Sequence, residues 1–201
     1  MAPQKTTPAQ LLLRRLKLIR RNDDGATAIE FAIVSMPFLA LLFGIMSVSL
    51  VFFWIFTMEN AVWAASRDLR TGVFQTQAVG SRYAGKTGDA LKTEFKKSVC
   101  ERSASYSDCM ASTRILVQAR TTFGGGGGLV APNCLKNDNT LVDESSAWAA
   151  FDAGAASSVV MVTACYSWAF GGKLPILKLN KTADGGYLIQ ASSAFRTEPY
   201  N

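Results

Sequence analysis

The longest run without a charged side chain most constrains how this chain can fold. It covers residues 31–58, 28 residues between Glu30 and Glu59. A helix needs about 20 apolar residues to cross the hydrocarbon core of a bilayer. At 1.5 Å per residue, 28 residues extend about 42 Å, so the run predicts a spanning helix that tilts or continues past the bilayer.

The apolar run fits a membrane-spanning helix better than it fits the core helix of a soluble protein or a removable secretory signal. The core helix of a soluble protein normally has a polar face, and this run has none. A removable secretory signal has an apolar core of about 7–15 residues, roughly half the length of this one. We therefore expect a single membrane-spanning helix.

Positive charge is concentrated before the helix. Residues 1–25 contain six basic and two acidic side chains, so +4 of the net charge of +6 lies there. An excess of Lys and Arg beside a span predicts a cytoplasmic N-terminus. The remaining residues carry a balance of only +2, which gives no support for a nucleic-acid partner.

Glu30 is the one carboxylate at the start of the apolar stretch, and two interpretations stay open for it. It can lie in the headgroup zone without a function. Alternatively, it can pair with a new positive charge, since a cut between Gly25 and Ala26 would create an α-amino group that is charged near neutral pH. In that case the amine of a neighbouring subunit could neutralise Glu30 in lipid.

Three stretches of the sequence resemble one protein family. Gly25 is followed by Ala-Thr-Ala-Ile-Glu-Phe-Ala and an apolar helix, which is similar to a class III prepilin signal. More specifically, it resembles the TadE-like family, minor pseudopilins of the Flp/Tad (tight adherence) pilus machinery. Residues 60–67 (NAVWAASR) resemble the Asn-Ala-Ala-Arg run that follows the family's helix. Residues 194–200 (AFRTEPY) resemble its closing Arg-Asn-Glu-Pro-Tyr and depart from it at Thr197. Residues 73–155 show no such resemblance.

The resemblance implies a processing site, an assembly site and a set of partners. A membrane aspartic peptidase, the prepilin peptidase, would cut between Gly25 and Ala26, making Glu30 the fifth mature residue and Phe31 the next. The protein would be a single-pass protein of the bacterial inner membrane with its C-terminal domain in the periplasm. Other pilins or pseudopilins and the Tad assembly platform would be its partners, and incorporation into the pilus would be one outcome.

The expected organisation is a basic leader, residues 1–25, a transmembrane helix and stalk, residues 26–72, and an exported domain, residues 73–201. Within the domain, spacing predicts an amphipathic helix over 89–99 and strands over 114–122, 158–170 and 187–195. We expect a loop or weak strand over 71–88 and a helix or loop over 145–151, while five glycines at 124–128 interrupt the chain. The fold class is therefore α+β, with a small antiparallel sheet after the long helix, in agreement with a pilin-like architecture.

Four cysteines follow the predicted span: Cys100, Cys109, Cys134 and Cys165. The far side of a bacterial inner membrane is oxidising, so two disulfides are expected. Three pairings are possible, and we favour Cys100 with Cys109 and Cys134 with Cys165. A zinc site is disfavoured because the sequence has no histidine and no Cys-x-x-Cys pair.

Residues 80–87 (GSRYAGKT) match the pattern of a phosphate-binding loop. We do not expect nucleotide binding, because Gln75 and Gln77 precede the motif where a buried strand is required and because the segment lies on the exported side. With no histidine and no defensible carboxylate pair, the sequence predicts neither an enzyme nor a cofactor. The alternative to a pseudopilin is an unprocessed, signal-anchored envelope protein whose periplasmic domain binds a ligand or partner.

Overall fold

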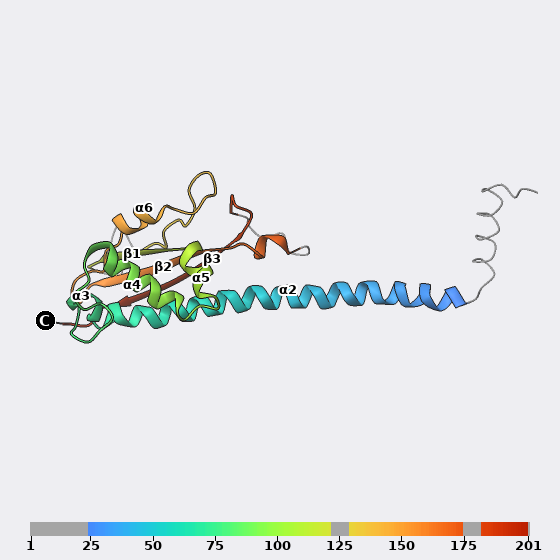
Figure 1. The fold of residues 1–201 in the computed structure, drawn as a ribbon, viewed down its shortest axis with the longest axis horizontal. Coiled ribbons are helices and arrows are strands. Elements are labelled where there is room, and N and C mark those ends of the chain that lie inside the picture. The colour runs from blue at the N-terminus through green and yellow to red at the C-terminus, as the bar shows by residue number, and fades with distance from the viewer. Residues whose placement is uncertain (1–23, 122–128, 175–181, 201) are drawn as a thin grey trace, which may run out of the picture. The chain divides into compact units, whose positions relative to one another are not determined.

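The computed structural model describes residues 24–121, 129–174 and 182–200 (Figure 1). Residues 1–23 of the basic leader and the five glycines lie outside these ranges. The chain divides into two compact units, residues 1–46 and residues 47–201. Helix α2, Asp24–Arg70, runs from the first unit into the second.

In the first unit, α2 has no buried side. From Thr27 to Met46 every side chain is exposed or half-exposed. Pro37 lies inside the helix, which continues on both sides of it. This confirms the long apolar N-terminal helix predicted from the sequence.

In the second unit, one face of α2 is buried. Its buried residues recur at helical spacing: Val51, Met58, Ala61, Ala65 and Leu69. The last three have exposed fractions of 0%. Residues 59–70, which the sequence assigns to a stalk, therefore supply part of the hydrophobic core.

A three-stranded antiparallel sheet lies in the second unit, with the order β1-β2-β3. Its strands are β1, Thr113–Arg120, β2, Val159–Trp168, and β3, Tyr187–Arg196. All three predicted strands are confirmed, with ends that shift by two residues or fewer. The register pairs Ile115 with Ala164 and Ala164 with Ala191, so alternate residues of each strand share the face with the core residues of α2.

In the described part of the chain, five short helical segments connect these elements: α3, Val73–Thr76, α4, Gly88–Cys100, α5, Tyr106–Ser112, α6, Glu144–Ala149, and the 3-10 helix η1, Gly171–Lys173. The predicted helix α4 is confirmed, and the ambiguous segment at 145–151 is helical up to Ala149.

The expectation of a loop or weak strand over residues 71–88 is wrong at α3. A four-residue segment does not form a stable helix by itself. The side chain of Phe74 is buried, and its ring centroid lies 5.2 Å from that of Tyr83 and 5.7 Å from that of Phe95. Tertiary packing of one aromatic ring thus stabilises this turn.

The C-terminal segment of the chain packs against Gly72, just after the end of α2. Its φ of 78° lies in the left-handed region, and an added Cβ would lie 2.4 Å from the ring of Tyr200. The nearby Glu198 amide donates to the Arg70 carbonyl over 2.8 Å. The C-terminal segment therefore packs against a position that only glycine can occupy.

We expect Gly72→Ala to destabilise the domain by about 1–2 kcal/mol from backbone strain alone. The clash with Tyr200 adds to this cost. Urea unfolding of the full chain in detergent measures the loss. Gly80→Ala is the control, because Gly80 also has a left-handed φ of 81° but an added Cβ there meets nothing within 4 Å. Equal losses in the two variants would contradict a role for the Tyr200 contact.

Candidate functional site: the N-terminal helix and the exported domain

The predicted processing and assembly residues lie on the first two turns of α2. Gly25 is exposed, and a Cβ added there would have no heavy atom within 4 Å. Glu30 is exposed, and Phe31 is 73% exposed. Within residues 24–121, 129–174 and 182–200, no ion pair involves Glu30. Glu30 is therefore a carboxylate surrounded by exposed apolar side chains.

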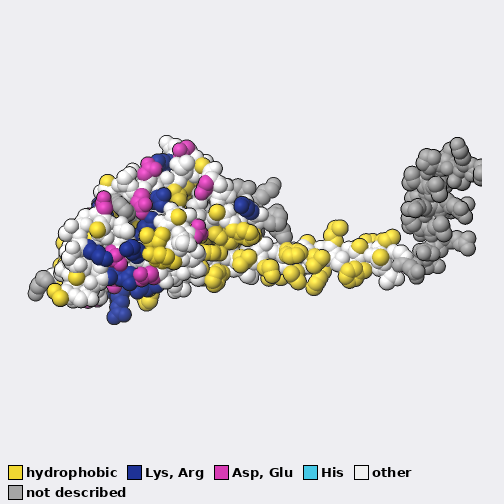
Figure 2. Space-filling view, viewed as in Figure 1, with side chains coloured by type: hydrophobic (Ala, Val, Ile, Leu, Met, Phe, Trp, Pro, Cys, Tyr) yellow, Lys and Arg dark blue, Asp and Glu magenta, His cyan; other side chains and the backbone are white. Residues whose placement is uncertain are grey.

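Apolar side chains cover the surface of the N-terminal part of α2 (Figure 2). The exposed large ones in the first unit are Ile29, Phe31, Ile33, Val34, Met36, Phe38, Leu39, Leu41, Leu42, Phe43, Ile45 and Met46. Among the described residues, one helix is long and apolar enough to span a membrane, Thr27–Arg70. Only 11% of its most apolar window is buried, whereas the core helix of a soluble protein is mostly buried. One long apolar N-terminal helix of this kind fits a membrane-anchored protein.

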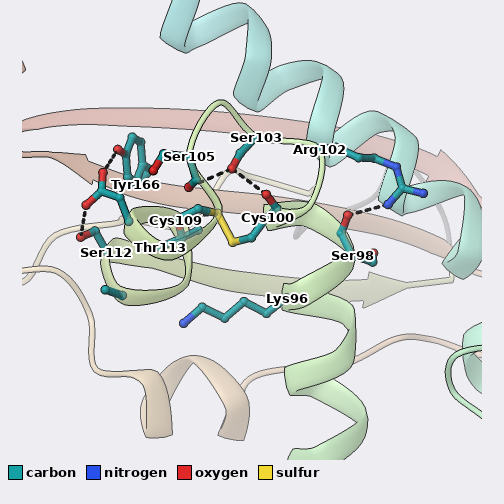
Figure 3. Close-up of a disulfide and its surroundings, with 12 residues drawn as sticks. Lys96, Ser98, Cys100, Arg102, Ser103, Ser105, Cys109, Ser112, Thr113 and Tyr166 are labelled. Atoms are coloured by element: carbon teal, nitrogen blue, oxygen red, sulfur yellow. Dashed lines mark hydrogen bonds between the residues drawn. A yellow bond between two sulfur atoms is a disulfide. The ribbon is translucent and has the colours of Figure 1, made fainter.

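Two disulfides cross-link the second unit. Cys100 at the end of α4 is joined to Cys109 in α5, and Cys134 is joined to Cys165 in β2. These are the two pairs favoured from the sequence. In Figure 3 the first disulfide closes the turn between α4 and α5, where the Ser103 hydroxyl donates to the Cys100 carbonyl over 2.8 Å. All four cysteines are buried.

Lys96 forms a buried ion pair that sequence reasoning missed. The α4 pattern places lysines on the exposed side, but the Lys96 side chain is only 2% exposed and its ammonium group contacts Glu144 of α6. Burial lowers the pKa of Lys96, and the Glu144 carboxylate opposes that shift. The pair links α4 to α6.

Two carboxylates of the second unit accept hydrogen bonds from buried tyrosines. Tyr166 of β2 donates its hydroxyl to Asp108 of α5, and Tyr83 donates to Asp68 of α2 over 2.8 Å. Burial raises the pKa of both phenols. These carboxylates thus act as acceptors for core tyrosines and hold α5 and α2 in place.

The segment that matches a phosphate-binding loop has a different geometry. Helix α3 precedes it, where a parallel strand is required. The Lys86 ammonium contacts Glu94 of the following helix, and the Tyr83 side chain in the middle of the motif is fully buried. The motif is therefore anchored to the core by Tyr83, while its other residues are exposed or half-buried. No cluster of three metal-ligating side chains occurs among the described residues.

A groove of about 660 Å³ lies between the end of α2 and β3. Trp63, Arg67, Arg70 and Arg102 line it together with residues 193–195 of β3. Two of the arginines are already engaged: Arg70 lies 3.8 Å from the Glu198 carboxylate, and Arg102 donates to the Ser98 carbonyl over 2.5 Å. No pattern in the sequence indicates this groove, because its basic residues come from segments far apart in the chain.

Comparisons with known proteins bear on the helix rather than on the sheet. No curated protein and no solved structure matches the chain. The model of the TadE-like protein family matches residues 25–67. This range covers the start of the helix with Gly25, Glu30 and Phe31, and extends to Arg67 in the segment that resembles the family's Asn-Ala-Ala-Arg run. Over residues 25–67, which include the apolar surface of the N-terminal helix, the chain is similar to the TadE-like protein family.

Proposed function

We propose that this chain is a minor pseudopilin of a Flp-type pilus, cut by a prepilin peptidase after Gly25 and assembled through its apolar helix. The observation that carries the proposal is the apolar stretch of α2 from Thr27 to Met46. It is exposed on all sides, has Glu30 as its one carboxylate, and lies inside the range that matches the TadE-like family. The leader lies in the cytoplasm and the sheet domain in the periplasm.

Processing gives Glu30 a function. A carboxylate near the centre of a bilayer costs about 3 kcal/mol, and less near the interface. A free α-amino group at Ala26 of a neighbouring subunit supplies the opposite charge in a medium where ion pairs are strong. The apolar side chains beside Glu30 gain no hydrophobic free energy on leaving lipid for another helix. The charge pair is then the directional contact that selects the register between subunits.

We expect Glu30→Gln to leave processing intact and to reduce the amount of this subunit in sheared pili at least tenfold, about 1.4 kcal/mol of lost assembly free energy. Immunoblots of the sheared and membrane fractions measure both steps. Glu59→Gln is the matched control, because Glu59 is an exposed carboxylate at the other end of the same apolar run. Wild-type incorporation of the Glu30→Gln protein would remove this side chain from the assembly mechanism.

An unprocessed, signal-anchored envelope protein is the second candidate. The groove beside Arg67, Arg70 and Arg102 favours it, since ligand sites are typically concave and carry a few polar groups. N-terminal sequencing of protein extracted from membranes separates the candidates. The pseudopilin begins at Ala26, and the anchored protein begins at Met1 or Ala2.

A further inference from the structure

We propose that the sheet domain lies on the phospholipid surface, with Phe170 and Lys173 of the loop after β2 inserted among the headgroups. This inference depends on the membrane anchoring in the proposed function, but it does not depend on processing or on the pilus. Its partner is the bilayer that α2 itself crosses.

The first argument is where burial begins along α2. Thr27–Met46 is 20 residues, about 30 Å of helix, which equals the hydrocarbon thickness of a bilayer. The next residue, Ser47, is 7% exposed and Val51 is 8% exposed. The second compact unit therefore starts at the residue that follows this 20-residue stretch, and the part of α2 that packs on the sheet starts there too.

The second argument is the direction of β2. Its last residues meet α2 early in the second unit, since the Trp54 ring lies 5.6 Å from the rings of Tyr166 and of Trp168. Its first residues lie farther along α2, because Val160 pairs with Phe195 and Phe195 lines the groove with Arg67. Strand β2 thus runs antiparallel to α2 and ends on the side where α2 enters the unit, as Figure 1 shows for the orange segment that follows β2.

The third argument is the place of the loop in the fold. Strand β2 ends at Trp168, and Phe170 follows two residues later. The Trp168 ring packs on Trp54, which lies within the first eight residues of the second unit. The loop therefore lies at the end of the sheet domain where α2 enters it.

The fourth argument is the chemistry of the loop. The Phe170 side chain is 55% exposed and Lys173 is exposed. Phe52, Phe53 and Phe56 on α2 are exposed by 52–56%. Aromatic rings favour the membrane interface, and lysines favour anionic headgroups. No acidic residue occurs between Phe170 and Leu174.

The loop is also held firmly enough to act as an anchor. The rings of Trp168 and Phe170 lie 5.9 Å apart. A Cβ added to Gly171 would lie 2.3 Å from the Trp168 ring and 2.7 Å from Tyr187, so the chain packs closely there. The carboxylate of Asp184, on the same hairpin, accepts hydrogen bonds from Ser167 and Thr182, which satisfies it within the protein.

Photo-crosslinking in a defined bilayer tests the inference. The full chain, with Phe170 replaced by p-benzoylphenylalanine, is placed in nanodiscs of phosphatidylethanolamine and phosphatidylglycerol and irradiated. Val79→p-benzoylphenylalanine is the matched control, because Val79 is fully exposed and follows α3, beyond the far end of α2. Mass spectrometry counts lipid and protein adducts, and protection of α2 from protease confirms insertion.

We expect at least ten times more lipid adduct at position 170 than at position 79. Equal yields at the two positions in a protease-protected protein would overturn the proposal while leaving membrane anchoring intact. Adducts from position 170 to a second copy of the chain would overturn it in favour of a subunit interface. Loss of protease protection itself would instead refute the anchoring on which both inferences depend.

Discussion

A Gly25→Val variant is expected to keep its leader, so that full-length precursor accumulates and mature protein falls at least tenfold, about 1.4 kcal/mol of lost transition-state binding. The peptidase must bring its catalytic carboxylates close to the carbonyl of residue 25, and a β-branched side chain there would obstruct the approach. The size difference of 25 residues on an immunoblot, or the intact mass, measures the result.

The structure makes this test specific. A Cβ at Gly25 would meet no atom within 4 Å, so valine there disturbs no contact of the folded protein. Gly44 has the same open surroundings on the same helix, and Gly44→Val is therefore the matched control, for which we expect normal processing. Wild-type levels of mature Gly25→Val protein would contradict the proposed cut.

Removing the disulfide between Cys134 and Cys165 is expected to be the largest single loss of stability. The two cysteines are 31 residues apart, against 9 for Cys100 and Cys109. Since loop-closure entropy in the unfolded chain grows with loop length, the double alanine variant at 134 and 165 should lose about 3–4 kcal/mol, and the variant at 100 and 109 about 2–3 kcal/mol.

Urea unfolding of the full chain in detergent, followed by tryptophan fluorescence, measures both losses. Trp54 and Trp168 lie in contact across α2 and β2, so their emission reports separation of helix and sheet. Each double variant is the control for the other, because both remove two buried half-cystines. A greater loss from the shorter loop would contradict the chain-entropy argument and indicate that local packing decides.

The elements that could be predicted from the sequence are those whose signal is local. A 28-residue uncharged run predicts a helix in a membrane, because only a helix satisfies all backbone groups of one segment in lipid. Alternation in β1 and β3 marks strands because one face of each meets the core. The central strand β2 is a nearly continuous apolar run because it is buried on both faces.

What could not be predicted depends on contacts between distant segments. The buried face of α2 cannot be recognised in the sequence between Ser47 and Met58, because the residues that pack on the sheet and those that stay exposed are equally apolar. Helix α3 exists because Phe74 contacts Tyr83 and Phe95. The ion pair of Lys96 needed the position of α6, which no spacing within α4 provides.

The residues of the candidate site also fall into those that the sequence could predict and those that required the folded structure. Gly25, Ala26, Glu30 and Phe31 were identified from their order along the chain, and their roles stay predictions. The groove beside Arg67 and Arg102 and the loop at Phe170 required the folded structure. Both arise from residues that come together only when α2 meets the sheet.

Helix α2 is both the apolar N-terminal helix and part of the core of the second unit, and this affects the order in which the protein can fold during synthesis. Val51, Met58, Ala61 and Leu69 leave the ribosome more than a hundred residues before β3 does, yet they form one core with it. In the proposed topology, the later turns of the helix therefore stay uncovered until the last strand has been translocated. A fragment that starts at Glu59 would lack the Trp54 and Met58 part of that core, so a fragment that keeps every core residue of α2 begins no later than Val51.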